Sequence, residues 1–198
     1  MDKTLLYYEN NAETFIDETV KVNFSDVADR FLAYLHDGAA ILDYGCGSGR
    51  DTRYFLERGF LVEAVDGSEK LCRYASCYTG IPVKCMLFQE LEEYQKYDGI
   101  WACASVLHVA KKDLPGIFER MIKALKENGI IYVSFKYGDS EENRKDRFFS
   151  DFTLESFTVF SVQFPELRIM EKWISGDVRP GRGEERWLNV ILKKTVMP

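Results

Sequence analysis

Short apolar runs alternate with amphipathic segments over most of the chain. Five apolar runs are rich in strand-forming residues and are bounded by glycine, proline or charged residues. They predict strands at 39–44, 60–66, 81–88, 97–104 and 129–137. Between them, apolar positions recur at helical spacing and predict helices at 50–59, 68–78 and 114–129. Strands that alternate with helices of this length are typical of crossover units, so we expect a parallel sheet.

The two ends of the chain extend this pattern. Two helices are predicted ahead of the first strand, at 4–20 and 24–36. A charged, glycine-containing loop and one more helix follow the fifth strand, at 138–147 and 153–160. An antiparallel hairpin is predicted at one edge of the sheet, from two last strands at 167–174 and 186–194. The expected fold class is α/β, a three-layer α/β/α sandwich in a single domain.

Composition narrows the class of protein. The chain has 198 residues, of which 46% are apolar and 29% charged, so it can bury a core and is not disordered. Its net charge of −6 gives no general attraction to nucleic acid. No run of 18 apolar residues occurs, and the start MDKTLLYYENN lacks the features of a signal peptide. We therefore expect a cytoplasmic monomer or homodimer that binds neither nucleic acid nor a membrane.

Cysteine and histidine give no sign of a metal site. The two histidines, His36 and His108, lie far apart and away from any cysteine pair. The chain has an odd number of cysteines and no CxxC pair: Cys46, Cys72, Cys77, Cys85 and Cys103. This pattern predicts reduced thiols and no bound metal.

The most informative segment is a glycine-rich loop at the end of the first predicted strand. An acidic residue is followed by glycine at every second position and then by a helix, in the sequence Asp43-Tyr44-Gly45-Cys46-Gly47-Ser48-Gly49-Arg50. Glycines here permit a sharp turn and let a ligand lie against bare backbone. The carboxyl end of a strand is also where open parallel sheets bind ligands.

The chemistry of the loop favours one kind of ligand. The loop lacks the Lys-Ser/Thr of a phosphate-binding P-loop. A dinucleotide loop would have glycine or alanine in place of Arg50, and a carboxylate at Asp43 would repel a pyrophosphate but accept from an ammonium group. Asp66, at the end of the second strand, can accept from both hydroxyls of a ribose. A ribose and an amino acid without phosphates are the parts of S-adenosylmethionine.

With these motifs the chain resembles the class I S-adenosylmethionine-dependent methyltransferases. Residues 38–137 carry the resemblance, and the hairpin expected at 167–194 agrees with the family's last two strands. It implies a Rossmann-like, mostly parallel seven-stranded sheet with an antiparallel C-terminal hairpin, and S-adenosylmethionine as the cofactor. The single domain, 1–198, would then consist of a helical lid segment (1–37), a cofactor-binding core (38–137) and a substrate-side loop, helix and terminal hairpin (138–198).

The resemblance also implies where the cofactor binds. In the family, the glycine-rich loop holds the methionine part, the acidic end of the second strand binds the ribose, and residues after the third and fourth strands flank the adenine and the methionine. The expected cofactor-binding residues are therefore Asp43, Gly45, Cys46, Gly47, Gly49, Arg50, Asp66, Gly67, Phe88, Gln89, Glu90, Ala102 and Cys103. Two of them have other readings, since Arg50 could be a surface residue and Asp66 could only cap the helix after it.

Within the class, the N-terminal segment YYENNAETFIDET resembles that of small, single-domain methyltransferases of the tellurite-resistance type and related small-molecule enzymes. In these relatives the first tyrosines close over the cofactor, which implies a cofactor contact for Tyr8. A second tyrosine that many relatives have is replaced here by Phe15.

The acceptor side of the expected site is less specific. His108 follows the fourth strand and is either a general base or a packed residue, because methyl transfer often needs only proximity. Four cations lie in segments that can reach the cleft, where they either bind an anionic acceptor or form solvated turns: Lys136, Arg147, Arg179 and Arg182.

The sequence thus predicts an enzyme that transfers a methyl group from S-adenosylmethionine to a small-molecule, anionic acceptor by in-line displacement. Residues 102–105 read Ala-Cys-Ala-Ser and lack the Asn/Asp-Pro-Pro-aromatic motif that the resemblance would tie to amino groups of nucleic acid bases. The alternatives are a non-catalytic S-adenosylmethionine-binding module, a polypeptide or RNA methyltransferase, and an NAD-dependent oxidoreductase. The last conflicts with Arg50 in the loop.

Overall fold

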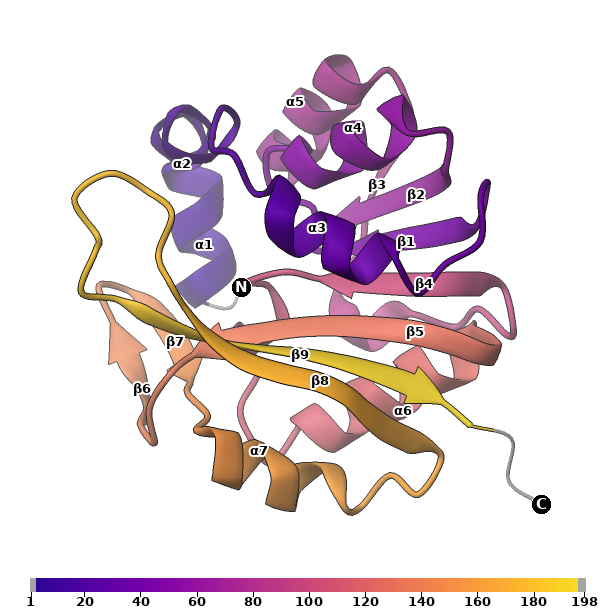
Figure 1. Ribbon diagram of the computed structural model, residues 1–198. Coiled ribbons are helices and arrows are strands. Elements are labelled where there is room, and N and C mark those ends of the chain that lie inside the picture. Colours follow the sequence, from indigo (N-terminus) through magenta and orange to yellow (C-terminus); the bar gives the residue numbers. More distant parts are fainter. Residues whose placement is uncertain (1–2, 196–198) are drawn as a thin grey trace.

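A seven-stranded sheet runs through the computed structural model, which describes residues 3–195 (Figure 1). The strand order is β3-β2-β1-β4-β5-β9-β8. The strands are β1 (Ala40–Tyr44), β2 (Leu61–Asp66), β3 (Val83–Cys85), β4 (Tyr97–Ala102), β5 (Leu125–Lys136), β8 (Leu167–Gly176) and β9 (Arg186–Lys194). Neighbours from β3 to β5 are parallel, whereas β9 runs antiparallel to both β5 and β8. The predicted sheet and its C-terminal hairpin are confirmed.

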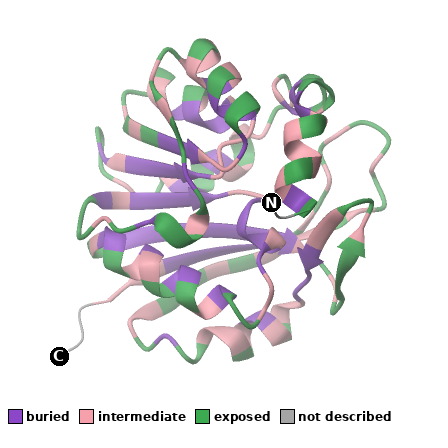
Figure 2. Ribbon diagram, turned by 180° about the vertical axis from the view of Figure 1, so that it is seen from behind, coloured by how far each residue is buried: buried purple, intermediate pink, exposed green. Residues whose placement is uncertain are grey.

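Helices cover both faces of this sheet (Figure 1). One face packs against α3 (Ser25–Leu32) and α4 (Arg50–Glu57), with α5 (Glu69–Thr79) beside α4. The other packs against α6 (Leu114–Ala124) and α7 (Leu154–Ser161). Successive residues of β1 point to opposite faces of the sheet. Ile41 packs with the buried residues of the α3–α4 side, and Leu42 packs with those of the α6–α7 side. Buried residues gather on the central strands, as Figure 2 shows, and the three-layer prediction is confirmed.

Elements from distant parts of the chain meet at the edge where the parallel strands end. They are α1 (Lys3–Asn10), α2 (Ala12–Thr19), the hairpin of β6 (Glu141–Arg144) and β7 (Arg147–Ser150), and two short 3₁₀ turns, η1 (Phe88–Glu90) and η2 (Val106–His108). Helix α1 packs on both α5 and β7, and β7 packs on η2 (Figure 1). The N-terminal helices and the β6–β7 hairpin therefore lie side by side over this edge.

Two predicted helices end earlier than expected. The helix predicted at 114–129 ends at Ala124, because Leu125 pairs with Tyr97 and begins β5. The helix predicted at 4–20 is broken at Asn11, whose side-chain amide donates to the carbonyl oxygen of Tyr7 (2.8 Å). The backbone angles of Asn11, φ −113° and ψ 20°, depart from helical values, so α1 and α2 are separate elements.

Two further segments also differ from the prediction. The charged loop predicted at 138–147 contains β6 and the first residue of β7. The strand predicted at 81–88 is reduced to Val83–Cys85 and is followed by η1. By contrast, α5 begins as expected after Ser68, whose hydroxyl oxygen accepts from Leu71 N (3.3 Å) and caps the helix.

Residues 1–2 of the predicted lid segment and residues 196–198 lie outside the described range of 3–195. Within that range no helix is long and apolar enough to cross a membrane. No group of three His, Cys, Asp or Glu side chains in that range is placed to hold a metal ion.

We expect Phe118 to be a main support of the layer formed by α6 and α7. Its ring is buried and contacts Phe157, Phe160 and Phe164. Replacing Phe118 by alanine leaves a cavity and should lower the free energy of unfolding by about 3–5 kcal/mol in urea denaturation. Val159→Ala, at an exposed position of α7, is the control and should change stability by about 0.5 kcal/mol or less. Equal losses in both variants would contradict this packing.

Candidate functional site

The glycine-rich loop makes a tight turn between β1 and α4. Gly45, Gly47 and Gly49 have φ angles of +89°, +56° and +77°, which residues other than glycine rarely adopt. The backbone N–H groups of Gly45 and Cys46 both donate to Val65 O at 2.9 Å. A Cβ on Gly45 would lie 2.5 Å from Ser105 Cβ. The turn therefore requires glycine, and it leaves bare backbone at the end of β1.

Asp66 ends β2 next to this loop. One carboxylate oxygen accepts from Gly47 N and the other from Ser68 N, each at 2.9 Å. Burial raises the pKa of Asp66, while these backbone hydrogen bonds act in the opposite direction. The bonds hold the carboxylate in one orientation and leave it further acceptor positions, because each oxygen can accept from more than one donor.

Asp43 is buried at the end of β1 and accepts from Thr52 Oγ1 at 2.6 Å. Burial, with a smaller contribution from Asp51, raises the pKa of Asp43 to about 8. Arg50 makes two hydrogen bonds to Asp51, of 2.6 and 2.8 Å, and its guanidinium lies over the ring of Phe24. Arg50 is thus a half-buried, paired residue and not the surface residue of the alternative reading.

A cavity of about 1160 Å³ opens along the carboxyl ends of the strands. Its walls come from the glycine-rich loop, the ends of β2 and β4, α1, the β6–β7 hairpin and the segment between β8 and β9. Most of the predicted cofactor-binding residues line it: Tyr8, Asp43, Gly45, Cys46, Gly47, Arg50, Asp66, Gly67, Phe88, Gln89 and Cys103. The sequence therefore predicted most of one wall of a single cavity.

Three of the predicted cofactor-binding residues do not line this cavity. Gly49 precedes α4 and packs against α5, where a Cβ would lie 2.9 Å from Thr79 Cγ2. The carboxylate of Glu90 accepts from Leu87 N at 2.7 Å and so closes η1. Ala102 is fully buried in the core on the α6 side. These residues shape the site from behind.

Tyr8 and His108 meet across the cavity. The Tyr8 hydroxyl lies 2.8 Å from His108 Nε2, and His108 Nδ1 lies 2.6 Å from the carbonyl oxygen of Phe148. Because a carbonyl oxygen can only accept, Nδ1 carries a proton; with a neutral imidazole, the Tyr8 hydroxyl then donates to Nε2. In addition, Phe148 N donates to Thr4 Oγ1 at 3.0 Å, so α1 is tied to β7 both directly and through His108.

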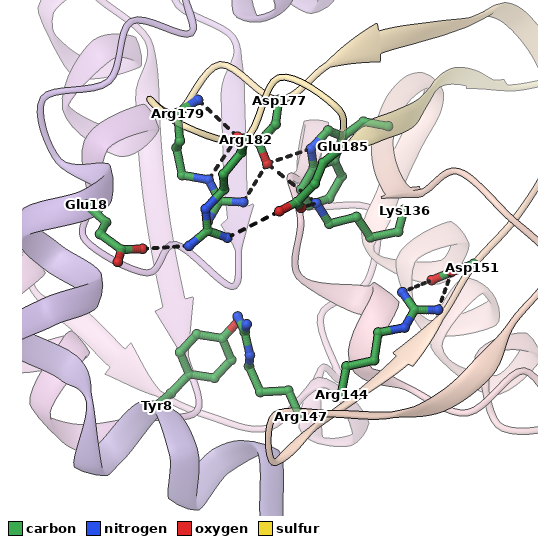
Figure 3. A network of polar contacts seen from close by, with 11 residues as sticks. Tyr8, Glu18, Lys136, Arg144, Arg147, Asp151, Asp177, Arg179, Arg182 and Glu185 are labelled. Carbon is green, nitrogen blue, oxygen red and sulfur yellow. Dashed lines mark hydrogen bonds and ion pairs between the residues drawn. The ribbon is translucent and has the colours of Figure 1, made fainter.

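Three of the four predicted substrate-side cations are neutralised by carboxylates (Figure 3). Lys136 pairs with Glu185 and lies 3.4 Å from Asp177, and burial lowers the pKa of Lys136. Arg179 makes a second pair with Asp177 at 2.6 Å. Arg182 pairs with Glu18 of α2 at 2.9 Å. Arg147 has no carboxylate partner among the described residues.

Two acidic residues of this site, Asp177 and Asp51, were not predicted from the sequence. Asp177 accepts from Arg179 and from the Trp187 indole N–H. Burial opposes ionisation of Asp177, but these hydrogen bonds hold its pKa well below the ordinary value. Asp51 accepts from the Trp101 indole N–H at 2.8 Å as well as from Arg50. The sequence offered one clue to each, since Asp51 directly follows Arg50 and Asp177 lies two residues before Arg179.

The two cysteines of the predicted site are half-buried thiols with raised pKa values. Burial is the main cause that raises the pKa of both Cys46 and Cys103. A nucleophilic cysteine needs a lowered pKa, so neither thiol fits that role.

A family model described as a methyltransferase domain matches residues 41–129. Among solved structures, the 1,6-didemethyltoxoflavin-N1-methyltransferase of Burkholderia thailandensis, with bound 1,6-didemethyltoxoflavin and S-adenosylhomocysteine, is 22% identical with a TM-score of 0.79. The alignment covers 96% of this chain and 85% of that one. A TehB-like S-adenosylmethionine-dependent methyltransferase of Corynebacterium glutamicum is 19% identical with a TM-score of 0.72, over 96% of this chain and 99% of that one.

Two curated relatives, from Bacillus subtilis and Acetivibrio thermocellus, are each 29% identical, over 119 and 99 residues. The second is named malonyl-[acyl-carrier protein] O-methyltransferase. The alignments cover 54% and 48% of this chain, and 48% and 34% of those proteins, so the chain spans half or less of the curated relatives it matches.

The buried Asp43 makes stability depend on pH. The folded protein holds the Asp43 proton up to about pH 8, whereas an unfolded chain releases it near pH 4. Its contribution to stability is therefore complete below about pH 4 and is lost as the pH rises to about 8. In urea denaturation without added ligand, the free energy of unfolding should fall from pH 6 to pH 8 by up to about 1.4 kcal/mol per unit more than in Asp43→Asn. If the free energies of unfolding of the native protein and Asp43→Asn changed in parallel with pH, the predicted effect of Asp43 would be contradicted.

The matched segment and the fold point to the same family. Residues 41–129 run from β1 to the start of β5 and include the glycine-rich loop and Asp66. The order and direction of all seven strands agree with the fold that the sequence motifs implied. Residues 41–129 thus match a methyltransferase domain, the whole chain has the fold of class I S-adenosylmethionine-dependent methyltransferases, and both findings support S-adenosylmethionine as the cofactor.

Proposed function

We propose that the protein transfers the methyl group of S-adenosylmethionine to a small, anionic molecule bound in the same cavity. One observation carries this proposal. A single cavity joins the glycine-rich loop to a second wall made by α1, the β6–β7 hairpin and the β8–β9 segment. Its volume of about 1160 Å³ exceeds the roughly 300–1,000 Å³ of most ligand pockets, and this leaves room for two molecules side by side.

The residues at the loop end fit the cofactor. Bare backbone at Gly45 and Gly47 lets a ligand approach closely, and the fixed carboxylate of Asp66 would accept from the ribose hydroxyls. Asp43 would accept from the ammonium group of the methionine part, and Phe88 and Gln89 would flank the adenine. When bound, S-adenosylmethionine supplies a methyl group on a sulfonium, which is already activated for displacement.

The second wall would hold the acceptor and exclude water. Helix α1 is tied to η2 by the Tyr8–His108 contact and to β7 by the Thr4–Phe148 contact. Arg182 ties the β8–β9 segment to Glu18 of α2. These elements close over the cavity from two sides, and holding the donor beside the acceptor supplies most of what methyl transfer needs. His108 Nε2 would take up an acceptor proton only after the Tyr8 hydroxyl has moved away from it.

One named relative supports a small acceptor, since the Burkholderia enzyme binds 1,6-didemethyltoxoflavin. The Acetivibrio protein is named for a malonyl group on acyl-carrier protein, which supports a carboxylate on the acceptor but not its small size. The net charge of −6 disfavours a nucleic acid acceptor, because binding to its phosphates requires positive charge.

A second candidate is a non-catalytic module that binds S-adenosylmethionine. The [4+2]-cyclase SpnF, an enzyme named for a reaction other than methyl transfer, has the same fold, with a TM-score of 0.75 and 12% identity over 100% of this chain and 97% of that one. The fold therefore does not by itself fix the reaction. The match to a methyltransferase domain favours S-adenosylmethionine over NAD as the ligand of the glycine-rich loop.

Calorimetric titration with S-adenosylhomocysteine tests the cofactor site. We expect micromolar binding by the native protein and no heat from NAD. Asp66→Asn should weaken binding about tenfold or more. It keeps the shape of the side chain but removes the negative charge that accepts hydrogen bonds from the two ribose hydroxyls. Asp37→Asn, at an exposed position before β1, is the matched control and should bind normally. Unchanged affinity in Asp66→Asn would contradict the assigned ribose site.

Turnover separates the enzyme from the binding module. The protein is incubated with methyl-labelled S-adenosylmethionine and a panel of aromatic and aliphatic acids, each paired with its neutral amide. An enzyme for anionic acceptors should release S-adenosylhomocysteine with some acids and with none of the matching amides. Binding of S-adenosylhomocysteine without any turnover, on the panel or on small-molecule extracts of cells, would favour the non-catalytic module.

A further inference from the structure

Arg147 stands apart from the other three predicted substrate-side cations, Lys136, Arg179 and Arg182. It begins β7 and lies in the wall opposite the glycine-rich loop, with its side chain beside Tyr8 in Figure 3. The neighbouring Arg144 of the same hairpin turns instead to Asp151, with which it makes two hydrogen bonds. Both arginines line the cavity, but Arg147 is the one without a carboxylate partner among the described residues.

The other three predicted substrate-side cations are already balanced by carboxylates. Asp177 and Glu185 neutralise Lys136 and Arg179, and Glu18 neutralises Arg182. No carboxylate among the described residues pairs with Arg147. An anion that enters the cavity therefore finds an uncompensated charge at Arg147, whereas binding at Arg179 or Arg182 would require it to displace a carboxylate.

The polar atoms of Arg147 are also incompletely used. Its Nε is buried and has no hydrogen-bond partner. Its Nη1 makes only a long contact of 3.5 Å with the Tyr8 hydroxyl oxygen, whose proton is directed to His108. A buried donor without an acceptor costs free energy, so the free protein holds this group in a state that a bound oxyanion would relieve.

Aromatic rings hold the guanidinium in place. Its central carbon lies 4.6 Å from the centroid of the Tyr7 ring and 5.2 Å from that of Phe149. Such contacts fix the plane of the guanidinium without using its N–H donors. Tyr137, Phe148 and Trp187 line the same part of the cavity and provide apolar surface for a flat molecule.

We propose that Arg147 binds an oxyanion of the methyl acceptor, a carboxylate or a phosphate, carried on a flat, apolar body. This proposal rests on the proposed function, because it assigns the acceptor class of that same cavity. A planar guanidinium matches two oxygens of such a group at once. Lys136, Arg179 and Arg182, by contrast, shape the β8–β9 segment through their ion pairs and do not contact the acceptor's charge.

Small aryl anions test this assignment without knowledge of the natural acceptor. The protein, saturated with S-adenosylhomocysteine, is titrated calorimetrically with benzoate, phenyl phosphate and neutral benzamide. We expect one of the two anions to bind at least tenfold more tightly than benzamide, and the preferred anion tells a carboxylate from a phosphate. Arg147→Gln should weaken that binding about tenfold or more, since it removes a charge-assisted contact.

Two further variants separate recognition from general electrostatics. Lys3→Gln removes one positive charge from an exposed lining position of the same cavity and should leave anion affinity within about twofold. Arg147→Lys keeps the charge but not the two-pronged geometry, so it should bind the preferred anion more weakly than the native protein. All variants should bind S-adenosylhomocysteine as the native protein does, which also reports that they are folded.

Three results would overturn the proposal. They are equal binding of anions and benzamide, unchanged anion affinity in Arg147→Gln, and an equal loss in Arg147→Gln and Lys3→Gln. Each of these leaves the proposed function intact as long as S-adenosylhomocysteine binds. Failure of the native protein to bind S-adenosylhomocysteine would instead overturn the proposed function itself.

Discussion

The hydrogen bond from Gly47 N to the carboxylate of Asp66 joins the ends of the two strands on which the site depends. It can form only because the loop after β1 takes left-handed backbone angles and folds against Val65 O. Once it forms, the carboxylate has one orientation, and bare backbone borders the cavity beside it. The sheet order places this point at the carboxyl edge, where α1 and the β6–β7 hairpin can cover it.

The two ends of the cavity differ in how their charges are treated. At the loop end, acidic groups are buried: Asp43 has a raised pKa, and Asp51 is paired with Arg50. At the other end, cations and carboxylates cancel in pairs that tie flexible segments to the body of the protein, such as Arg182 to Glu18. A cationic cofactor at the first end and an anionic acceptor near Arg147 at the second would complement this distribution.

Local sequence rules were sufficient for the sheet and the loop. Apolar strands, glycines at every second position and acidic strand ends act through neighbouring backbone, so their geometry follows from the sequence alone. The helix predicted at 114–129 failed at Ala124 because the pairing of Leu125 with Tyr97 is a contact between strands, which helical spacing cannot reveal. The β6–β7 hairpin was missed for the same reason, since its charged residues have no strand-forming pattern.

The acceptor side could not be read from residue types. An arginine in a glycine-rich segment looks the same whether it binds a ligand or a carboxylate of the chain, and the partners of Arg179 and Arg182 became visible only with the fold. The same holds for Tyr8, whose contact with His108 joins residues that are 100 positions apart. Long-range polar pairing thus decides which cations remain available to a ligand.

A crystal structure of the protein with S-adenosylhomocysteine would test the central claim most directly, that one cavity serves both cofactor and acceptor. The account predicts electron density for the ribose at Asp66, and the sulfur facing the space between Tyr8 and Arg147. Density for the product elsewhere, or a sulfur turned away from that space with Asp66 in contact only with Gly47 and Ser68, would contradict it.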